Sequence, residues 1–377
     1  MEGENFFGRE KELDFAWKQI QKGNSMILSA PRRVGKSSFA KKILTMAKVE
    51  GWNTLEINLE EIKSEEGFVK IFVEKIKNEN WWDKAKSKAG KIIESIKPEI
   101  EYEGVKATLE WKSQKVDIYE KLKNLIDHSK ETLIMVDELT ILLNCFLEND
   151  KENGKQNVEF FLNWLRSFRQ VSCTKIRWVF CSSIGIENFA SQHNLSLTLN
   201  DVPPFPIGAF SESQSILFIN ALSQSEGITL PEKLQLYMVN KIGWCLPYFI
   251  QILFLNFHKL IELENHPVST ETIDKAYEIL IMEKHLNTWD ERLKEYSNLQ
   301  TNARAILKNL SQNTEGQTRE SIYSLLYAKI KDEDETEKIV SQLLNMLSND
   351  GYLIENNSKY AFRSPLLRDF WFNRFVK

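Results

Sequence analysis

A lysine followed by two serines ends a short loop, residues 30–38 (APRRVGKSS). The loop follows the apolar run 26–28 (MIL) and precedes a helix-prone stretch, 39–47, so we expect a strand to enter it and a helix to leave it. Such a turn directs backbone N–H groups and the positive end of a helix dipole at one point, where polyphosphate charge is stabilised. The sequence therefore predicts a phosphate-binding loop for a nucleoside triphosphate.

The loop matches the pattern G-x-x-x-x-G-K-[ST] except at its first position, where alanine replaces glycine and keeps the small volume. Gly35 would let the backbone approach the phosphates, Lys36 would reach the β- and γ-phosphates during binding and catalysis, and Ser37 would offer its hydroxyl to Mg²⁺. Arg32 and Arg33 would hold loop and phosphate charge or contact a neighbouring domain. The predicted nucleotide-binding residues are Ala30, Pro31, Arg32, Arg33, Val34, Gly35, Lys36, Ser37 and Ser38.

Two carboxylates end an apolar run further along the chain, residues 132–138 (TLIMVDE). A strand that is apolar throughout suits a parallel sheet covered on both faces, and its carboxyl end reaches the edge where α/β sheets bind ligands. Asp137 would hold Mg²⁺, and Glu138 would orient the water that attacks the γ-phosphate. A chance turn or a solvated strand end explains each motif alone, but their order, spacing and surroundings together predict a site for Mg²⁺·ATP.

Three further residues are candidates for catalysis. Ser182 ends the apolar run 176–181 and would sense the γ-phosphate or the attacking water, with Ser183 or a helix N-cap as the alternatives. Arg166 and Arg169 lie on a helix-prone stretch after the acid pair, and either would serve as a finger that stabilises transition-state charge within or between subunits. The alternative for both arginines is the solvent face of an amphipathic helix.

Composition limits the class of protein. With 377 residues, 42% of them hydrophobic, the chain can form two or three domains with separate cores. No N-terminal apolar run follows positive charge, and no stretch reaches the length of a membrane span, so we expect a cytoplasmic protein with no membrane partner. The four cysteines and five histidines are dispersed, which predicts reduced thiols and neither a disulfide framework nor a zinc site.

The charge balance bears on the partners of the chain. A formal net charge of −4 gives no overall attraction to nucleic acid, because non-specific binding needs a basic face. Local basic patches occur at residues 84–91 (KAKSKAGK) and at Arg363, Arg368, Arg374 and Lys377. A solvated helix face is the more ordinary explanation for such charges.

The order of segments predicts an α/β fold class, with a P-loop parallel-sheet core and helices on both faces in residues 1–210. Prolines within 201–206 (DVPPFP) should end regular pairing where the chain leaves the sheet. Residues from about 78 to 117 depart from the βαβ order. We interpret them as an insertion that carries a β-hairpin, with two short strands in 99–111.

The rest of the chain divides into two predicted domains. Residues 211–290 have helical periodicity throughout and would form a helical lid domain. Residues 291–377 begin with three helix-like segments, followed by a turn at 348–351 and two β-like runs, 352–354 and 359–362. Three helices followed by a short hairpin predict a winged-helix domain.

Five stretches together resemble a known family: FGREKEL at 7–13, the loop APRRVGKSS, MVDEL at 135–139, CSSIG at 181–185 and GWCLPY at 243–248. Over nearly its whole length the chain resembles the archaeal-type branch of the STAND ATPases, within the AAA+ superfamily. The resemblance implies an AAA+-like core and lid with ATP and Mg²⁺ as cofactors. It also implies that Gly8, Arg9 and Glu10 border the adenine, and that Pro247, which begins a lid helix, packs against the nucleotide.

The sequence thus predicts a slow ATPase that acts as a molecular switch. Mg²⁺·ATP between core and lid would fix their orientation, hydrolysis would release it, and the C-terminal domain or the insertion would carry the change to a protein partner. One alternative is an ATP-controlled DNA-binding protein that resembles replication initiators. Another is a nucleotide-binding scaffold, or the regulatory subunit of a defence or toxin–antitoxin pair. Homo-oligomerisation, the partner's identity and the role of the insertion stay open.

Overall fold

The computed structural model of the chain describes residues 6–30, 33–77, 105–182, 186, 189–190 and 193–377, with side chains left undescribed at 29, 105–114, 295 and 297. The chain forms two compact units. The first comprises the residues up to Ser29 together with 36–207, and the second comprises 30–35 together with 208–377.

The first unit is built on a four-stranded parallel sheet in the order β1-β4-β3-β2. Its register pairs Ser29 with Ser182 and Asn58 with Asp137, so the carboxyl ends of all four strands meet at one edge. Every residue of β3 and β4 is buried, as expected for a parallel sheet covered on both faces. The strands are β1 (Met26–Ser29), β2 (Asn53–Asn58), β3 (Thr132–Asp137) and β4 (Ile176–Ser182).

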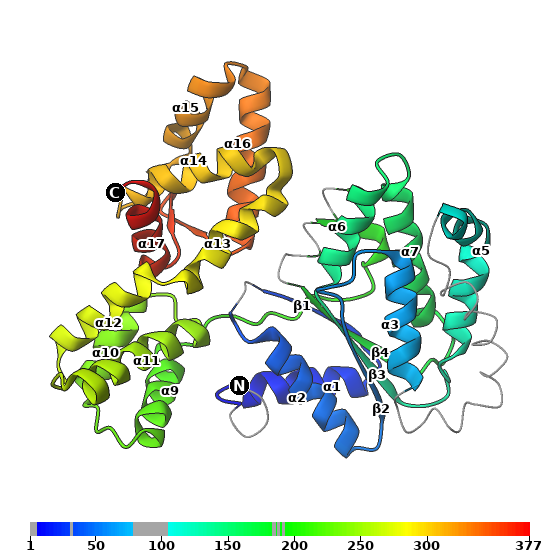
Figure 1. Cartoon of the computed structure of the whole chain (residues 1–377), viewed down its shortest axis with the longest axis horizontal. Coiled ribbons are helices and arrows are strands. Elements are labelled where there is room, and N and C mark those ends of the chain that lie inside the picture. Colours follow the sequence, from blue (N-terminus) through cyan, green and yellow to red (C-terminus); the bar gives the residue numbers. More distant parts are fainter. Residues whose placement is uncertain (1–5, 31–32, 78–104, 183–185, 187–188, 191–192) are drawn as a thin grey trace. The chain divides into compact units, whose positions relative to one another are not determined.

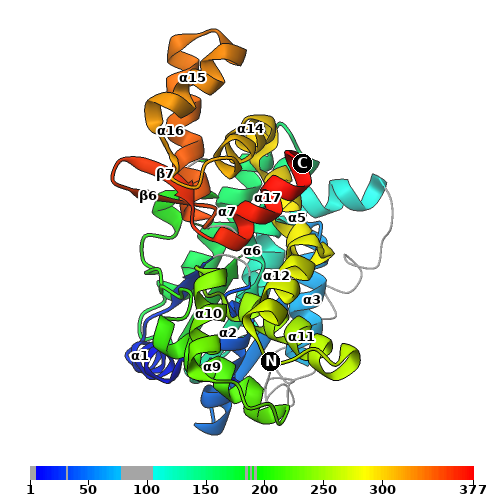
Figure 2. The ribbon, with the colours of Figure 1, turned by 90° about the vertical axis from the view of Figure 1, so that its left-hand side faces the viewer.

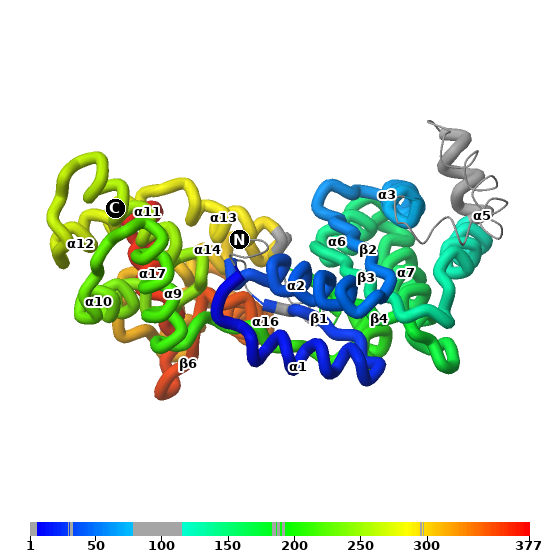
Figure 3. Tube along the Cα trace, turned by 90° about the horizontal axis from the view of Figure 1, so that it is seen from below, coloured from blue at the N-terminus to red at the C-terminus, as the bar shows by residue number. Residues whose placement is uncertain are grey.

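Helices cover both faces of this sheet, which confirms the predicted fold class (Figure 1). Alternate strand residues, such as Ile134, Val136 and Trp178, share a single core with the helices of one face. Figure 3 shows α1 lying alongside α2 on the other face. The first face carries α3 (Glu65–Lys77), α5 (Val105–Asn124), α6 (Leu139–Asn149) and α7 (Gly154–Arg169), and the second carries α1 (Glu10–Gln21) and α2 (Lys36–Val49).

Prolines end pairing beside β1, as the sequence indicates. A single parallel bridge joins Ile27 to Pro204, through Ile27 N–H to the Pro203 carbonyl at 3.2 Å and Phe205 N–H to the Ile27 carbonyl at 2.8 Å. Pro203, Pro204 and Pro206 have no N–H to extend a ladder. The rings of Phe15 and Phe39 pack against Phe205 and anchor this segment. A short 3₁₀ helix, Ser196–Thr198, precedes this proline-rich segment in the chain.

The predicted β-hairpin within 99–111 is wrong for its described part. Residues 105–111 belong to α5, while 99–104 lie outside the described residues. Alternation around Gly104 imitates a hairpin, but the run that follows (VKATLEWKSQK) is rich in helix-forming alanine, leucine, glutamate and lysine. Its continuation packs Ile118, Tyr119 and Leu122 into the sheet's core, so tertiary packing favours the helix.

The second unit begins with a helical segment, as the periodicity of 211–290 predicts. A capping box at Ser211 and Gln214 starts α9, and Pro247 occupies the first turn of α11. Gly243 ends α10 with φ 67° and ψ −62°, a conformation that few L-residues adopt. The helices are α9 (Glu212–Ser225), α10 (Glu232–Ile242), α11 (Pro247–Glu264), α12 (Thr270–Met282) and α13 (Asn287–Arg292), with 3₁₀ turns at Lys284–Leu286 and Leu293–Leu299.

The C-terminal segment contains four described helices and a three-stranded antiparallel sheet in the order β5-β7-β6. The helices and the β6–β7 hairpin follow the order predicted from the sequence, whereas β5 and the last helix were not expected. The winged-helix assignment remains a prediction. The elements are α14 (Gln300–Ser311), β5 (Gln317–Thr318), α15 (Arg319–Ile330), α16 (Glu333–Asn349), β6 (Leu353–Asn356), β7 (Lys359–Phe362) and α17 (Pro365–Phe375).

Direct contacts join the helical and C-terminal segments inside the second unit. The Ser364 hydroxyl donates to the Ile242 carbonyl at 3.1 Å, and the Tyr277 hydroxyl donates to an Asp369 carboxylate oxygen at 2.9 Å. Pro365 lies so close to Gly243 that a Cβ added there would stand 2.4 Å from its Cδ. These two segments therefore pack as one body. No helix in the described part of the chain is both long and apolar enough to cross a membrane.

Candidate nucleotide-binding site

Two predicted magnesium ligands, 100 residues apart in sequence, are in direct contact in the first unit. The Ser37 hydroxyl donates a 2.7 Å hydrogen bond to Oδ2 of Asp137. Ser37 lies in the first turn of α2 and Asp137 ends β3, so the parallel sheet brings them to its carboxyl edge. Lys36, the first residue of α2, is buried at the same edge with 7% of its surface exposed. The structure thus brings together the lysine, serine and aspartate expected from the sequence.

Asp137 is held in an electrostatically costly position. Burial raises the pKa of its carboxyl group above the ordinary value, and the nearby charge of Glu138 adds to this. The hydrogen bond from Ser37, the backbone N–H of Glu138 and the charge of Lys36 lower the pKa but do not cancel the burial effect. A cation bound here would relieve the desolvated negative charge, which is a reason for an acid to be retained at this position.

The second acid of the pair, Glu138, has a left-handed backbone, with φ 56° and ψ 40°, at the N-cap of α6. A non-glycine residue seldom adopts this conformation, and strain of about 1–3 kcal/mol is typical where it persists. Its backbone N–H donates to Oδ1 of Asp137 at 3.0 Å. The strained turn therefore gives the Asp137 carboxylate a backbone donor, and it changes the chain direction immediately after the strand, as functional turns often do.

Ser182 lies where the sequence places it, at the end of β4, and it is buried. Its hydroxyl shares a short hydrogen bond with the hydroxyl of Thr140, in the first turn of α6. Thr140 therefore joins Ser182 to the turn that carries Glu138. Sequence reasoning missed Thr140, although a hydroxyl two residues after the acid pair was the available signal. Ser183 lies outside the described residues.

The donors at this edge fit Mg²⁺. A serine hydroxyl and a carboxylate already converge within hydrogen-bond distance, and oxygen donors of this kind, completed by substrate phosphates, are what Mg²⁺ prefers. Across the residues the structure describes, no cluster of three or more His, Cys, Asp or Glu side chains could hold a metal ion by itself. Proteins usually bind Mg²⁺ through one or two carboxylates together with substrate phosphates, so Ser37 and Asp137 would hold it beside a phosphate.

The loop between β1 and α2 is described at Ala30 and from Arg33 onward, while Pro31 and Arg32 lie outside the described residues. Arg33 and Gly35 have positive φ values of 72° and 93°, and an added Cβ at Gly35 meets no described atom within 4 Å. Glycine is therefore needed there for its backbone conformation rather than for side-chain space. Val34 is buried, and Ser38 follows in the first turn of α2.

Residues 30–35 belong to the second unit, and so does Pro247. Within that unit the Arg33 guanidinium lies over the ring of Tyr248, 4.1 Å from the ring centre. A cation–π contact of this kind is worth about 0.5–2 kcal/mol. The sequence indicated only that Arg33 would hold charge or contact a neighbouring domain, and it assigned no role to Tyr248.

The N-terminal turn lies beside α2. Gly8 has φ 75°, and its N–H donates to Oε1 of Glu10 at 3.3 Å. Arg9 is the N-cap residue of α1 and is 4% exposed, and burial lowers the pKa of its guanidinium while Glu12 opposes the shift. The Phe6 ring lies 6.4 Å from that of Phe39, two residues after Ser37. The segment expected to border adenine is therefore close to the helix that begins with Lys36.

Both candidate finger arginines are engaged inside the first unit. Arg169 makes two hydrogen bonds to the Asp201 carboxylate, at 2.7 and 2.9 Å, and Arg166 donates to the Leu197 carbonyl at 2.6 Å. They lie at the end of α7, where the chain is about to enter the amino end of β4, away from the edge that carries Lys36. The first helix after the acid pair is α6, whereas both arginines lie on the second helix, α7. Because both side chains are bound to other residues away from Lys36, neither arginine is part of the mechanism that we propose below.

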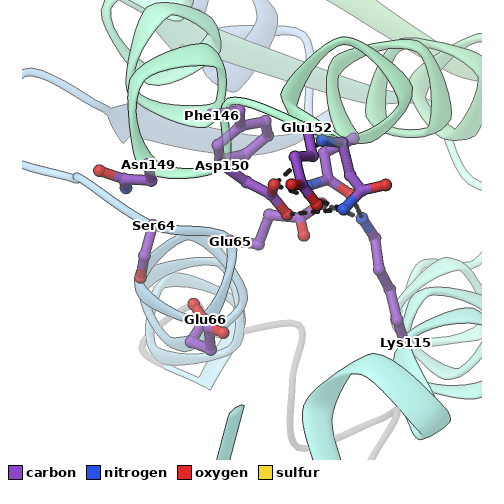
Figure 4. Close-up of a pocket in the computed structure, with 10 residues that line it drawn as sticks. Ser64, Glu65, Glu66, Lys115, Phe146, Asn149, Asp150 and Glu152 are labelled. Carbon is purple, nitrogen blue, oxygen red and sulfur yellow. Dashed lines mark hydrogen bonds and ion pairs between the residues drawn. The ribbon is translucent and has the colours of Figure 1, made fainter. Parts of the chain in front are cut away.

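A separate hollow of about 410 Å³ lies in the first unit (Figure 4). An ion pair of 2.7 Å joins Lys115 to Glu65 on its wall, and Lys115 also donates to Asn157 at 3.0 Å. No residue of the predicted nucleotide site lines it, and no sequence motif indicated it. Its lining residues are Ser64, Glu65, Glu66, Lys115, Phe146, Asn149, Asp150, Glu152, Asn153 and Asn157.

The parallel sheet, the loop between β1 and α2, and the acid pair at the end of β3 belong to a fold that this chain shares with a solved Walker-type ATPase. No family model matches the chain, and no curated protein matches it. Among solved structures, the chain is similar to the Walker-type ATPase PABY2304 of Pyrococcus abyssi, with 17% identity and a TM-score of 0.61 over 98% of this chain and 97% of that one.

The chain is also similar to the ORC2 protein of Aeropyrum pernix, solved as ADPNP and ADP complexes. Identity is 11%, and the TM-score is 0.56 over 100% of this chain and 98% of that one. At such identities the likeness shows the fold alone. It covers 98% and 100% of the chain, so the folds of both units have counterparts in these two solved structures.

Proposed function

We propose that this protein binds and slowly hydrolyses ATP and acts as a nucleotide-controlled switch. One observation carries the proposal, namely the 2.7 Å contact between Ser37 and Asp137, which unites two independent sequence motifs at the carboxyl edge of a parallel sheet. The ATPase fold of the solved neighbours supports it, as do the ADPNP and ADP bound to ORC2. The finer assignment to the STAND ATPases rests on sequence resemblance.

In the proposed mechanism, Lys36 would neutralise charge on the β- and γ-phosphates, and Ser37 and Asp137 would hold Mg²⁺. When bound, the ion would further neutralise the phosphate charge. The Glu138 carboxylate accepts a hydrogen bond from a water and then its proton as the water oxygen attacks the γ-phosphorus. The bond from that phosphorus to the bridging oxygen breaks, giving ADP and phosphate. Ser182 would contact the γ-phosphate, and its hydrogen bond with Thr140 would connect this contact to the turn that carries Glu138.

The remaining assignments follow the family resemblance. Gly8, Arg9 and Glu10 would border the adenine, and the closeness of Phe6 to Phe39 supports this. Pro247 would pack against the nucleotide from the helical segment. Because that segment and the proposed winged helix pack as one body, any displacement of α11 is carried to the C-terminal segment. Binding energy that differs between ATP and ADP would drive the displacement.

Substitution of Lys36 and Glu138 tests the proposal. Lys36→Ala should lose Mg²⁺·ATP binding in calorimetric titration, whereas Glu138→Gln should keep binding and slow phosphate release by about 100-fold or more, as for loss of a general base. Lys48→Ala, an exposed lysine in the last turn of the same helix, is the matched control and should behave like the parent. If Lys36→Ala hydrolyses ATP at the parent rate, the assignment of the site is wrong.

The DNA-binding alternative has a clear requirement, a basic surface on the C-terminal helices. Helix α16, which the proposed winged helix would present to a groove, begins instead with acidic residues. The scaffold and defence-partner alternatives are tested by nucleotide-dependent pull-down from cells, with Lys36→Ala as the control that should lose the nucleotide dependence.

A further inference from the structure

Helix α16 opens with an unusual density of negative charge. Its N-cap and first turns contain five carboxylates, and Lys338 is its only cation. All five acids are exposed. Asp332 caps the helix by accepting the Glu335 N–H at 2.8 Å, and one or two acids suffice to complement a helix dipole. The acids are Asp332, Glu333, Asp334, Glu335 and Glu337.

A pair of tyrosines stands beside these acids on the preceding helix. Tyr323 and Tyr327, one helical turn apart on α15, stack with ring centres 5.8 Å apart and planes 11° apart. Tyr327 keeps 39% of its surface exposed. A partly exposed stacked pair offers an aromatic surface at low cost in side-chain entropy, and such residues are enriched where proteins dock.

The acids and the tyrosines form one surface. Helices α15 and α16 lie side by side (Figure 2), and Arg319 ties them together through Glu337, at 2.6 and 3.0 Å, and Ser341, at 2.6 Å. Desolvation raises the pKa of the Tyr323 hydroxyl, and the charges of Glu333, Tyr327 and Glu337 raise it further, in line with the packing of α15 against α16. We call this surface the acidic–tyrosine face and define it as Tyr323, Tyr327, Asp332, Glu333 and Glu337.

The chemistry of this face selects its occupant. Phosphates of nucleic acid would be repelled by the carboxylates, because binding of a duplex depends on cations that replace its counterions. An arginine or lysine side chain satisfies both parts of the face, since its cation pairs with the carboxylates and also lies favourably over a tyrosine ring. Arg319 already shows such pairing with Glu337 inside the face.

We propose that the acidic–tyrosine face docks a basic, arginine- or lysine-rich segment of a partner protein. Charge complementarity and the exposed aromatic pair select this occupant over duplex DNA. The inference rests on the proposed function in one respect, because it names the class of partner that a nucleotide-controlled switch would engage. The docking itself requires no nucleotide, so it can be measured separately from ATP hydrolysis.

The test uses the full chain and a fluorescein-labelled oligo-arginine peptide, with anisotropy recorded at low and high salt. The peptide should bind the parent, and Glu333→Arg should weaken binding about tenfold. Glu278→Arg, the same charge change at an exposed position on α12, should change it by less than about twofold. Tyr327→Ala should weaken binding severalfold, whereas Tyr327→Phe, which keeps the ring, should not.

Three results would overturn the proposal. They are failure of the parent to bind the peptide, equal weakening by Glu333→Arg and Glu278→Arg, and salt-dependent binding of a labelled DNA duplex that Glu333→Arg abolishes. Glu333→Gln, which removes charge without reversing it, guards against misfolding and should lie between parent and Glu333→Arg. ATP turnover measured on the same samples separates this inference from the proposed function, because the Glu333 variants should keep the parent rate.

Discussion

Replacing Gly243 by alanine should loosen the second unit more than any ordinary glycine substitution. At φ 67° and ψ −62° an alanine is strained by about 1–3 kcal/mol. Its Cβ would also stand 2.4 Å from Cδ and 2.8 Å from Cγ of Pro365, a rigid ring that opens α17. Overpacking of this kind costs about 1–3 kcal/mol. The expected loss in the free energy of unfolding is therefore about 4 kcal/mol.

Gly227→Ala is the matched control. Gly227 has φ 68°, nearly the same as Gly243, but an added Cβ there meets no described atom within 4 Å. It should cost only the backbone strain, about 1 kcal/mol. Urea unfolding followed by tryptophan fluorescence measures both variants, because Trp244 and Trp289 are in ring contact next to Gly243. Equal destabilisation of the two would refute the claim that Pro365 requires a glycine.

Two further predictions concern the first unit. Burial raises the pKa of Asp137. The protonated Asp137 carboxyl therefore adds to folding stability below the ordinary carboxyl pKa, and this stability is lost as pH rises through the raised pKa. Asp137→Asn should therefore raise the melting temperature of the nucleotide-free protein more at neutral than at acidic pH, while Mg²⁺·ATP no longer raises it. A variant that melts below the parent at neutral pH would contradict this. Arg169→Ala should cost about 2 kcal/mol, because it breaks the partly exposed pair with Asp201, yet phosphate release per folded molecule should stay within about twofold of the parent. A loss of turnover without a loss of stability would return Arg169 to the mechanism.

The pair between Arg169 and Asp201 also has a defined pH dependence. Burial alone would raise the pKa of Asp201, but the hydrogen bonds and charge of Arg169 hold it below the ordinary value. The stability that this pair contributes to the fold is complete above the ordinary carboxyl pKa, and it is lost as pH falls through the lowered pKa of Asp201. The acid sensitivity of the parent should thus be reduced in Arg169→Ala.

The convergence of Lys36, Ser37 and Asp137 at one edge of the sheet could be predicted from the sequence because its signals are local. The loop around Lys36 and the strand that ends at Asp137 each carry their own pattern, and the parallel order of strands then requires their carboxyl ends to meet. The apolar runs of β3 and β4 gave the fold class for the same reason. Only Thr140, whose partner Ser182 is 42 residues away, depended on a contact that no local pattern reports.

What the sequence could not give depends on tertiary packing. Residues 105–111 are helical because they belong to α5, which packs later residues into the core of the sheet. These contacts outweigh the weak alternation of polar and apolar residues that favoured strands. Arg169 looked available for catalysis because its partner, Asp201, is distant in sequence. Gly243 opens one of the stretches that carry the family resemblance, but nothing in that stretch indicates its contact with Pro365, 122 residues later. Each case involves a contact that spacing along the chain does not encode.

The segment beside β1 keeps a strand of another chain from pairing at this edge of the sheet. Ile27 bonds to the groups of Pro203 and Phe205 that point inward, so the backbone nitrogens of the alternate residues, Pro204 and Pro206, face away from the sheet. Neither nitrogen carries a hydrogen. A foreign strand arriving on this side would find acceptors but no donors, and the sheet cannot be prolonged there into a fibre or a shared dimer sheet.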